Sequence, residues 1–250
     1  MSDGADIRSG QFKTLVRELP AMYDLLPSYP SLTSDPEPPD TASRPTISDF
    51  TAIGADSSLA ELAETNRAKV NDPTYDKPPT IVPLSGSAQP TLQSYTVNNG
   101  QPDCHRIVDG HDWGGDGTVY AGASYLRGQT PFPLPQQHGP IAKSPEGLNW
   151  VKHVIQHLTI GPPMGEGVGL HVPTIATAGE SIPITITHQN LGGITFKIQS
   201  ITGRQVPTPR LKHETTRDCT AVTLPEGLYT VSAQGGGFSE VTTDVLVNPR

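Results

Sequence analysis

The feature that most constrains the fold is a series of short alternating runs of apolar and polar residues, separated by turn-forming residues, over residues 168–250. Alternation is clearest at Ile182, Ile184 and Ile186, and it returns at Ile194, Phe196 and Ile198. Alternation with period two is typical of strands with one buried face. Many short strands in a segment of this length predict an antiparallel β-sandwich of immunoglobulin-like size. The Cys…Trp…Cys pattern of antibody domains is absent.

The character of the chain changes just before this segment, at "TIGPPMGEG". Its glycines and prolines are typical of a linker. We therefore expect an α/β portion over residues 1–160, a linker over residues 161–167 and an all-β sandwich over residues 168–250. The 26 prolines and 25 glycines of the chain indicate many turns and loops.

The first portion shows mixed patterns. Apolar spacing predicts a helix in "FKTLVREL" and another in "DSSLAELAETNRAKVND". "TIVPLSGS" is typical of a short buried strand, and "QSYTVNNGQPDCHRIV" predicts a hairpin around Asn98, Asn99 and Gly100. A strand is expected from Thr118 to about Tyr125. A last helix is expected after the N-cap Ser144, with an inner face that comprises Leu148, Val151, Val154, Ile155 and Leu158.

Composition excludes several classes of function. The net charge is −8 and no cluster of Lys or Arg occurs, which argues against binding to nucleic acid or anionic membranes. No apolar run is long enough for a transmembrane segment, and the N-terminus has no apolar core of a signal peptide. We expect a soluble, cytoplasmic protein unless the N-terminus is truncated. Cys104 and Cys219 are interpreted as unpaired small hydrophobic residues.

Two loop residues could carry chemistry. Asp116 lies in "GGDGTV" and His138 lies in "QQHGP", 22 residues later. An aspartate that accepts a hydrogen bond from an imidazole fixes its tautomer and stabilises the imidazolium, as in a catalytic triad. The alternative is that Asp116 is an ordinary turn residue and that His138 lies in an ordinary loop.

A resemblance supports the catalytic interpretation. "ELPAMYDLLPSYP", "GGDGTVYAGAS" and "QQHGPIAKSPEGLNWV", in this order, resemble the C-terminal part of the lecithin:cholesterol acyltransferase-like lipases, which are α/β-hydrolases. The resemblance covers roughly residues 10–158, with Tyr120 where that family usually has proline. It implies that Asp116 is the triad acid, that His138 is the triad base, and that "TIVPLSGSAQPT" and "GTVYAGAS" are the last two core strands. It also places Tyr23, Leu25 and Leu26 where an acyl pocket could lie, although helix packing explains them equally well.

The nucleophile of such an enzyme is missing from this sequence. α/β-hydrolases carry it in a G-x-S-x-G elbow before the acid and the histidine, and no such elbow occurs here. We therefore expect the C-terminal part of a lipase or acyltransferase-like serine hydrolase that acts on lipid or other esters. An upstream-encoded hydrolase half would supply the serine. The alternative is a non-catalytic interaction protein, in which the β-sandwich binds a partner and the hydrolase part is a remnant.

Other candidate sites have weaker patterns. His105, His111, Asp112 and Asp116 lie close in sequence and could hold zinc or calcium, but their spacing is not distinctive. His153 and His157 lie one helical turn apart without the Glu of a metalloprotease motif, so we interpret them as helix-end residues. Trp113 and Trp150 are expected in the core or in a pocket wall. No metal or organic cofactor is implied. The sandwich is expected to be either a structural appendage or a binding module.

Overall fold

The structure is a computed structural model that describes residues 9–36, 41–70, 81–126, 129–158, 167–188, 193–214, 217–235 and 239–250. Its contacts divide the chain into two compact units. The first comprises residues 1–80 and 93–112, and the second comprises residues 81–92 and 113–250. Residues 161–166 of the expected linker lie outside the described residues, so the domain boundary expected there stays a prediction.

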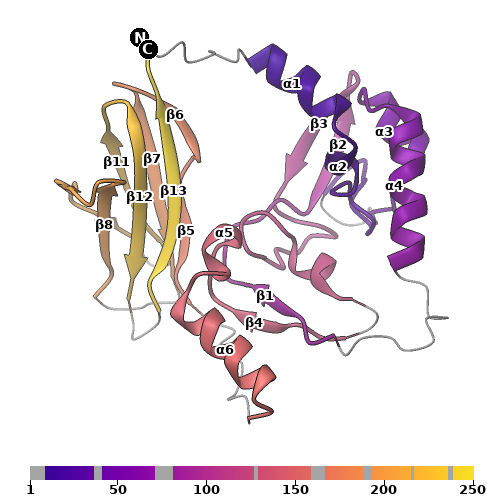
Figure 1. Cartoon of the computed structure of the whole chain (residues 1–250). Coiled ribbons are helices and arrows are strands. Elements are labelled where there is room, and N and C mark those ends of the chain that lie inside the picture. Colours follow the sequence, from indigo (N-terminus) through magenta and orange to yellow (C-terminus); the bar gives the residue numbers. More distant parts are fainter. Residues whose placement is uncertain are drawn as a thin grey trace. The chain divides into compact units, whose positions relative to one another are not determined.

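Four helices and a hairpin are described in the first unit (Figure 1). The helices are α1 (Ser9–Glu18), α2 (Pro20–Tyr23), α3 (Ile47–Ala52) and α4 (Ser57–Val70). Tyr23 lies in the small core of this unit with Ala60 and Ala63 of α4. Its hydroxyl donates to the Arg17 carbonyl oxygen and accepts from the Asp56 amide, each at 2.8 Å. The buried hydroxyl therefore has both partners that it needs.

The hairpin of the first unit forms where the sequence predicts it. Strand β2 (Ser94–Asn98) pairs antiparallel with β3 (Gln101–His105). Asn99 and Gly100 connect the strands with φ angles of 52° and 72°. Positive φ at both central residues is the geometry of a type I′ turn, which Asn-Gly favours.

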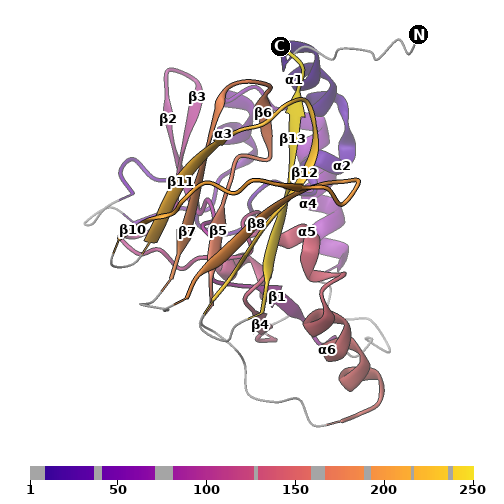
Figure 2. The same cartoon turned by 90° about the vertical axis from the view of Figure 1, so that its left-hand side faces the viewer.

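The second unit contains the predicted β-sandwich, with two sheets that lie face to face (Figures 1 and 2). One sheet has the strand order β10-β11-β7-β5 and the other has the order β6-β13-β12-β8-β9. All neighbouring strands are antiparallel except β6 and β13, which are parallel. The strands are β5 (Gly169–His171), β6 (Ile175–Thr177), β7 (Ser181–Thr187), β8 (Thr195–Ser200), β9 (Gln205–Val206), β10 (Lys212–His213), β11 (Arg217–Thr223), β12 (Gly227–Gln234) and β13 (Val241–Asn248).

The sandwich core follows the alternation in the sequence. Ile182, Ile184 and Ile186 of β7 are at most 2% exposed and face Val231 and Val245 of the opposite sheet in one cluster. Burial of each such side chain stabilises the fold by about 1.5–3 kcal/mol. The sandwich therefore has the largest apolar core among the described residues, and its all-β character is established.

The remainder of the second unit is a short α/β segment. Strand β1 (Leu84–Gly86) pairs in parallel with β4 (Phe132–Leu134), and within the described residues these two strands form a sheet of their own. The strand expected over residues 118–125 is wrong: Ala121–Ser124 form the 3-10 helix η1 instead. "AGAS" lacks the branched and aromatic side chains that favour strands, which agrees with its helical conformation. The strand that pairs with β1 is Phe132–Leu134 instead. The described residues thus contain no α/β-hydrolase sheet.

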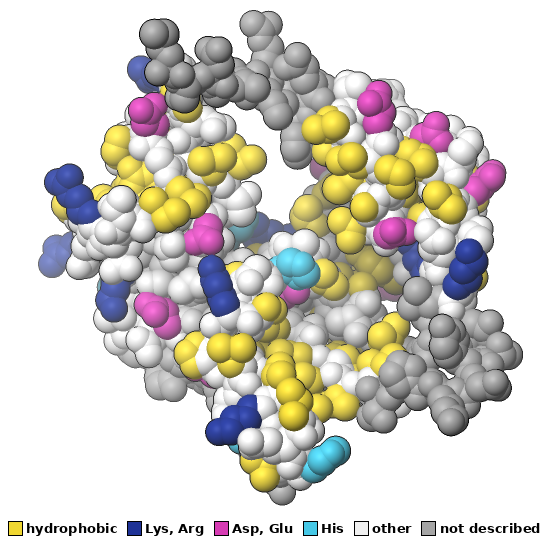
Figure 3. Space-filling model, in the orientation of Figure 1, with side chains coloured by type: hydrophobic (Ala, Val, Ile, Leu, Met, Phe, Trp, Pro, Cys, Tyr) yellow, Lys and Arg dark blue, Asp and Glu magenta, His cyan; other side chains and the backbone are white. Residues whose placement is uncertain are grey.

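Two helices follow β4, namely α5 (His138–Ile141) and α6 (Pro145–Ile155). The predicted cap of α6 is confirmed, since the Ser144 hydroxyl accepts from the Gly147 amide at 3.1 Å. The predicted inner face is wrong, because the buried residues of α6 are Gly147 and Trp150. Its apolar stripe is instead open to solvent, with exposed residues Leu148, Val151 and Ile155. Figure 3 shows hydrophobic side chains at the surface over α6.

Candidate functional site

Asp116 lies in a tight turn that its own side chain stabilises. Its Oδ1 accepts from the backbone amides of Thr118 at 2.9 Å and Val119 at 2.6 Å. The next residue, Gly117, has a φ of +89°, a conformation that glycine adopts without strain. An aspartate that binds amides two and three residues ahead forms an Asx-type turn. The turn therefore fixes the position of the carboxylate and leaves Oδ2 available.

The structure brings His138 to this carboxylate, as the sequence predicts. Nδ1 of His138 lies 2.8 Å from Oδ2 of Asp116. The His138 amide also donates to the Asp116 carbonyl oxygen at 2.8 Å. Because α5 begins at His138, backbone and side chain hold the first residue of that helix against the Asp116 turn.

Burial differs strongly between the two partners. The Asp116 side chain is 7% exposed, whereas the imidazole is 55% exposed. Because a carboxylate only accepts hydrogen bonds, Nδ1 carries the proton that it donates to Oδ2. In neutral His138, Nε2 is then the acceptor, and no described residue hydrogen bonds to it. The pair therefore exposes the acceptor Nε2 to solvent, and the hydrogen bond from Nδ1 to Asp116 fixes the tautomer of the imidazole.

Gly86, at the end of β1, packs directly against this pair. A Cβ atom built at Gly86 would overlap Cβ of Asp116 and lie 2.5 Å from the carbonyl oxygen of Gln136. Only glycine allows the strand to approach the carboxylate so closely. The close approach of Gly86 in β1 thus helps to set the position of Asp116.

The other residues singled out from the sequence have ordinary surroundings. Nε2 of His105 lies 3.2 Å from the Thr96 hydroxyl, and Nδ1 of His111 lies 2.8 Å from the Asp109 carbonyl oxygen. No group of three or more His, Cys, Asp or Glu side chains in the described part of the chain is arranged to hold a metal ion. Cys104 and Cys219 are both free thiols.

The tryptophans and the histidines of α6 also have defined positions. Trp150 is 9% exposed and lines a pocket, which is one of the two expected positions, whereas Trp113 is 59% exposed and lies outside the core. His153 lies in the last turn of α6, and His157 follows the helix with a φ of +53°. Among the described helices, none has the length and hydrophobicity to cross a membrane.

Sequence reasoning missed a second carboxylate–imidazole cluster, which lies in the sandwich. Asp218 of β11 is 1% exposed, and its Oδ1 lies 2.9 Å from Nδ1 of His213 and 3.4 Å from Nε2 of His188. His213 is five residues before Asp218, and the β10–β11 pairing places the two side by side. Asp218 shares one face of β11 with Val222, and a carboxylate at such a position of a strand was the signal that could have revealed the cluster.

Comparisons with known proteins identify no family. No family model matches the chain, and no curated protein matches it. The solved structures that match include a polysaccharide lyase, at 19% identity and a TM-score of 0.29, over 34% of this chain and 12% of the lyase. Another is the PKD domain of an M14-like peptidase from Thermoplasmatales archaeon SCGC AB-540-F20, at 22% identity and a TM-score of 0.23, over 32% of this chain and 92% of that one. A twitchin kinase fragment from C. elegans matches at 15% identity and a TM-score of 0.26, over 48% of this chain and 29% of the fragment.

Proposed function

We propose that Asp116 and His138 are the acid and the base of a serine-hydrolase site that cleaves or transfers the acyl group of lipid-like esters. The observation that carries this proposal is the 2.8 Å contact between Nδ1 of His138 and Oδ2 of the buried Asp116 carboxylate. In this proposal the chain is the C-terminal portion of an α/β-hydrolase followed by an immunoglobulin-like sandwich. The order of acid and histidine in the chain agrees with that of α/β-hydrolases.

The chemistry follows from the free Nε2 of His138. Nε2 removes the proton of a serine hydroxyl as the serine oxygen attacks the ester carbonyl, and it then donates that proton to the leaving alkoxide. Water or an acceptor alcohol then attacks the acyl-serine and gives its proton to Nε2, which passes that proton to the departing serine oxygen. Asp116 stabilises the imidazolium in both steps. The serine and the oxyanion donors come from outside the described residues.

The two-stranded sheet is an argument that a partner polypeptide completes the site. Parallel sheets are nearly always covered on both faces and contain several strands, yet β1 and β4 form a sheet of two in the described part of the chain. Additional parallel strands beside β1 would pair with its free edge and extend this sheet, and their crossover helices would cover its faces. An upstream-encoded hydrolase half of this kind would bring its nucleophile to the edge where Asp116 and His138 lie.

The test is an esterase assay of this chain co-expressed with the polypeptide encoded directly upstream. The substrate is p-nitrophenyl butyrate. His138→Ala should abolish turnover, and Asp116→Asn should lower kcat by roughly 10³–10⁴-fold, as loss of a triad acid does. The matched control His153→Ala removes a histidine of α6 and should leave the rate unchanged. Equal rates in all variants would refute the triad.

The exposed apolar stripe of α6 favours a second candidate function, namely a non-catalytic interaction protein. Leu148, Val151 and Ile155 lie on one side of this helix and are 42–71% exposed, which is typical of a surface that a partner covers. This function is preferred if intact upstream sequence encodes no G-x-S-x-G elbow and the co-expressed complex forms without esterase activity.

A further inference from the structure

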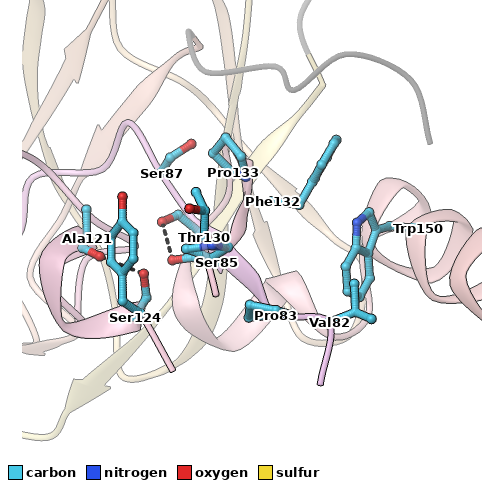
Figure 4. A pocket seen from close by; sticks show the side chains of 13 residues that line it. Val82, Pro83, Ser85, Ser87, Ala121, Ser124, Thr130, Phe132, Pro133 and Trp150 are labelled. Carbon is cyan, nitrogen blue, oxygen red and sulfur yellow. Dashed lines mark hydrogen bonds between the residues drawn. The ribbon is translucent and has the colours of Figure 1, made fainter. Parts of the chain in front are cut away.

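The second unit contains a pocket of about 550 Å³, a size typical of small-molecule sites. It lies between β1, η1, β4 and α6, and Figure 4 shows the side chains that line it. None of its thirteen lining residues is Asp, Glu, Lys, Arg or His. Because an ion would lose its hydration here without gaining a counter-charge, the lining selects a neutral molecule.

The walls are mostly apolar and locally stiff. Val82, Phe132 and Trp150 contribute apolar side chains, and the ring centroids of Phe132 and Trp150 lie 6.3 Å apart. Prolines flank Phe132 on both sides, at positions 131 and 133. A fixed φ at these prolines restricts the backbone that carries the Phe132 ring. The pocket thus presents a preformed apolar surface to a ligand.

Two polar atoms of the lining have no partner among the described residues, although both are buried. They are the indole Nε1 of Trp150 and the hydroxyl oxygen of Ser87. Figure 4 shows the indole nitrogen on the edge of the ring that faces Phe132 and the rest of the lining. Buried donors are almost always satisfied in native proteins, so each such exception requires an explanation.

Two other serine hydroxyls of the same pocket are already satisfied within the protein. Ser85 donates to the Gly86 carbonyl oxygen at 3.2 Å, and Ser124 donates to the Ala121 carbonyl oxygen at 2.6 Å. The buried side-chain polar atoms of this lining that have no partner among the described residues are therefore those of Trp150 and Ser87. An indole N–H only donates, so its missing partner is an acceptor.

We propose that this pocket binds a small, neutral, largely apolar molecule whose carbonyl oxygen accepts a hydrogen bond from Nε1 of Trp150. A ketone or an uncharged ester has this chemistry, whereas a fatty-acid anion does not. Ser87 provides a second polar contact in the same wall. The pocket shares Gly86 with the Asp116 turn, but binding requires neither Asp116 nor His138, so it does not rest on the proposed hydrolase site.

The test uses the indole N–H itself as the reporter, in a two-dimensional ¹⁵N–¹H NMR titration of the full chain with 2-octanone. The chain has two tryptophans, so the indole region holds two signals, and Trp113→Phe assigns the remaining one to Trp150. We expect a saturable downfield shift of the Trp150 signal and no shift of the Trp113 signal. Octanoate, which is similar in length but anionic, should bind at least tenfold more weakly.

Matched serine variants test the contribution of the Ser87 hydroxyl. Ser87→Ala should weaken 2-octanone binding about twofold to tenfold, the range for loss of one hydrogen bond. Ser200→Ala removes a hydroxyl of β8 that is outside the pocket and pairs with Thr202, so it should change binding less than twofold. A Trp150 signal that does not move up to the solubility limit of 2-octanone would overturn the proposal. Equal dissociation constants for octanoate and 2-octanone would also overturn it.

Discussion

Gly86 is the residue on which the geometry of the Asp116–His138 pair depends most directly. In Gly86→Ala the new methyl group would overlap Cβ of Asp116 and lie 2.5 Å from the Gln136 carbonyl oxygen. Neither atom can rotate away, so the backbone must move. We expect a loss of about 1–3 kcal/mol in the free energy of unfolding, measured by urea denaturation, and loss of the Nδ1–Oδ2 contact, measured by NMR of His138.

A matched control for this variant is Gly139→Ala. Gly139 is next to His138 in α5, and a Cβ built there has no heavy atom within 4 Å. Alanine also favours a helix more than glycine does. Gly139→Ala should therefore leave stability and the His138 signal unchanged or slightly improved. If both alanine variants behave alike, the close approach at Gly86 has no structural role.

Tyr95 in β2 gives a prediction for alkaline pH. Its hydroxyl is buried without a partner, and burial raises the pKa of Tyr95 to about 12, with the charges of Asp49 and Cys104 adding to the effect. The unfolded chain loses this proton near pH 10, whereas the folded protein keeps it to higher pH. The contribution of Tyr95 to the free energy of unfolding is therefore fully present below pH 10 and is lost as pH rises toward 12. Tyr95→Phe, which removes no hydrogen bond, should be at least as stable as wild type at pH 8.

The measurement is urea denaturation of both proteins at pH 8 and pH 11. Other groups titrate in this range in both proteins, so the difference between the two isolates the contribution of Tyr95. The wild type should lose more stability than Tyr95→Phe between these pH values. An equal loss would mean that Tyr95 ionises at its ordinary pKa in the folded protein.

At the scale of elements, the sequence predicts turns and helix caps better than it predicts whether a neighbouring element covers an apolar face. The Asn-Gly hairpin and the Ser144 cap are confirmed because both depend on residues within a few positions of each other. The apolar stripe of α6 is also where periodicity places it. Periodicity gives the direction of a stripe but not the presence of a neighbour, so the exposure of Ile155 could not be predicted.

The strand partner of β1 illustrates the same limit. "GTVYAGAS" begins like a strand, but its small residues fold into η1, and "FPL" at Phe132–Leu134 pairs with β1 instead. Two prolines surround Phe132, which argues against a strand from local propensity alone. Pairing between distant segments decided the outcome. The Asp116–His138 contact could be predicted only because a family resemblance supplied that long-range information.

At the scale of the whole molecule, the sandwich was the most predictable part because its information is local and repeated. Each strand shows its own alternation, and each buried position supports the same two-sheet arrangement. The short α/β segment depends instead on a few contacts over long separations, such as Gln136 with the Glu240 carbonyl oxygen. Such contacts leave no periodic signal in the sequence.

Because the information that specifies the sandwich is local to it, we predict that residues 167–250 fold as a separate fragment. Their core comprises fourteen buried residues between Val168 and Val247 and includes no side chain from outside the fragment. We expect a single cooperative thermal transition by circular dichroism. Ile186→Ala, at a residue with no exposed surface, should cost about 2–5 kcal/mol in the fragment and in the full chain alike. Ile175→Ala, at a residue 63% exposed on β6, is the control and should cost far less. A fragment that unfolds without a transition would show that the sandwich needs contacts from residues 81–92 and 113–158 of the same unit, such as the hydrogen bond from Gln137 to the Leu170 carbonyl oxygen.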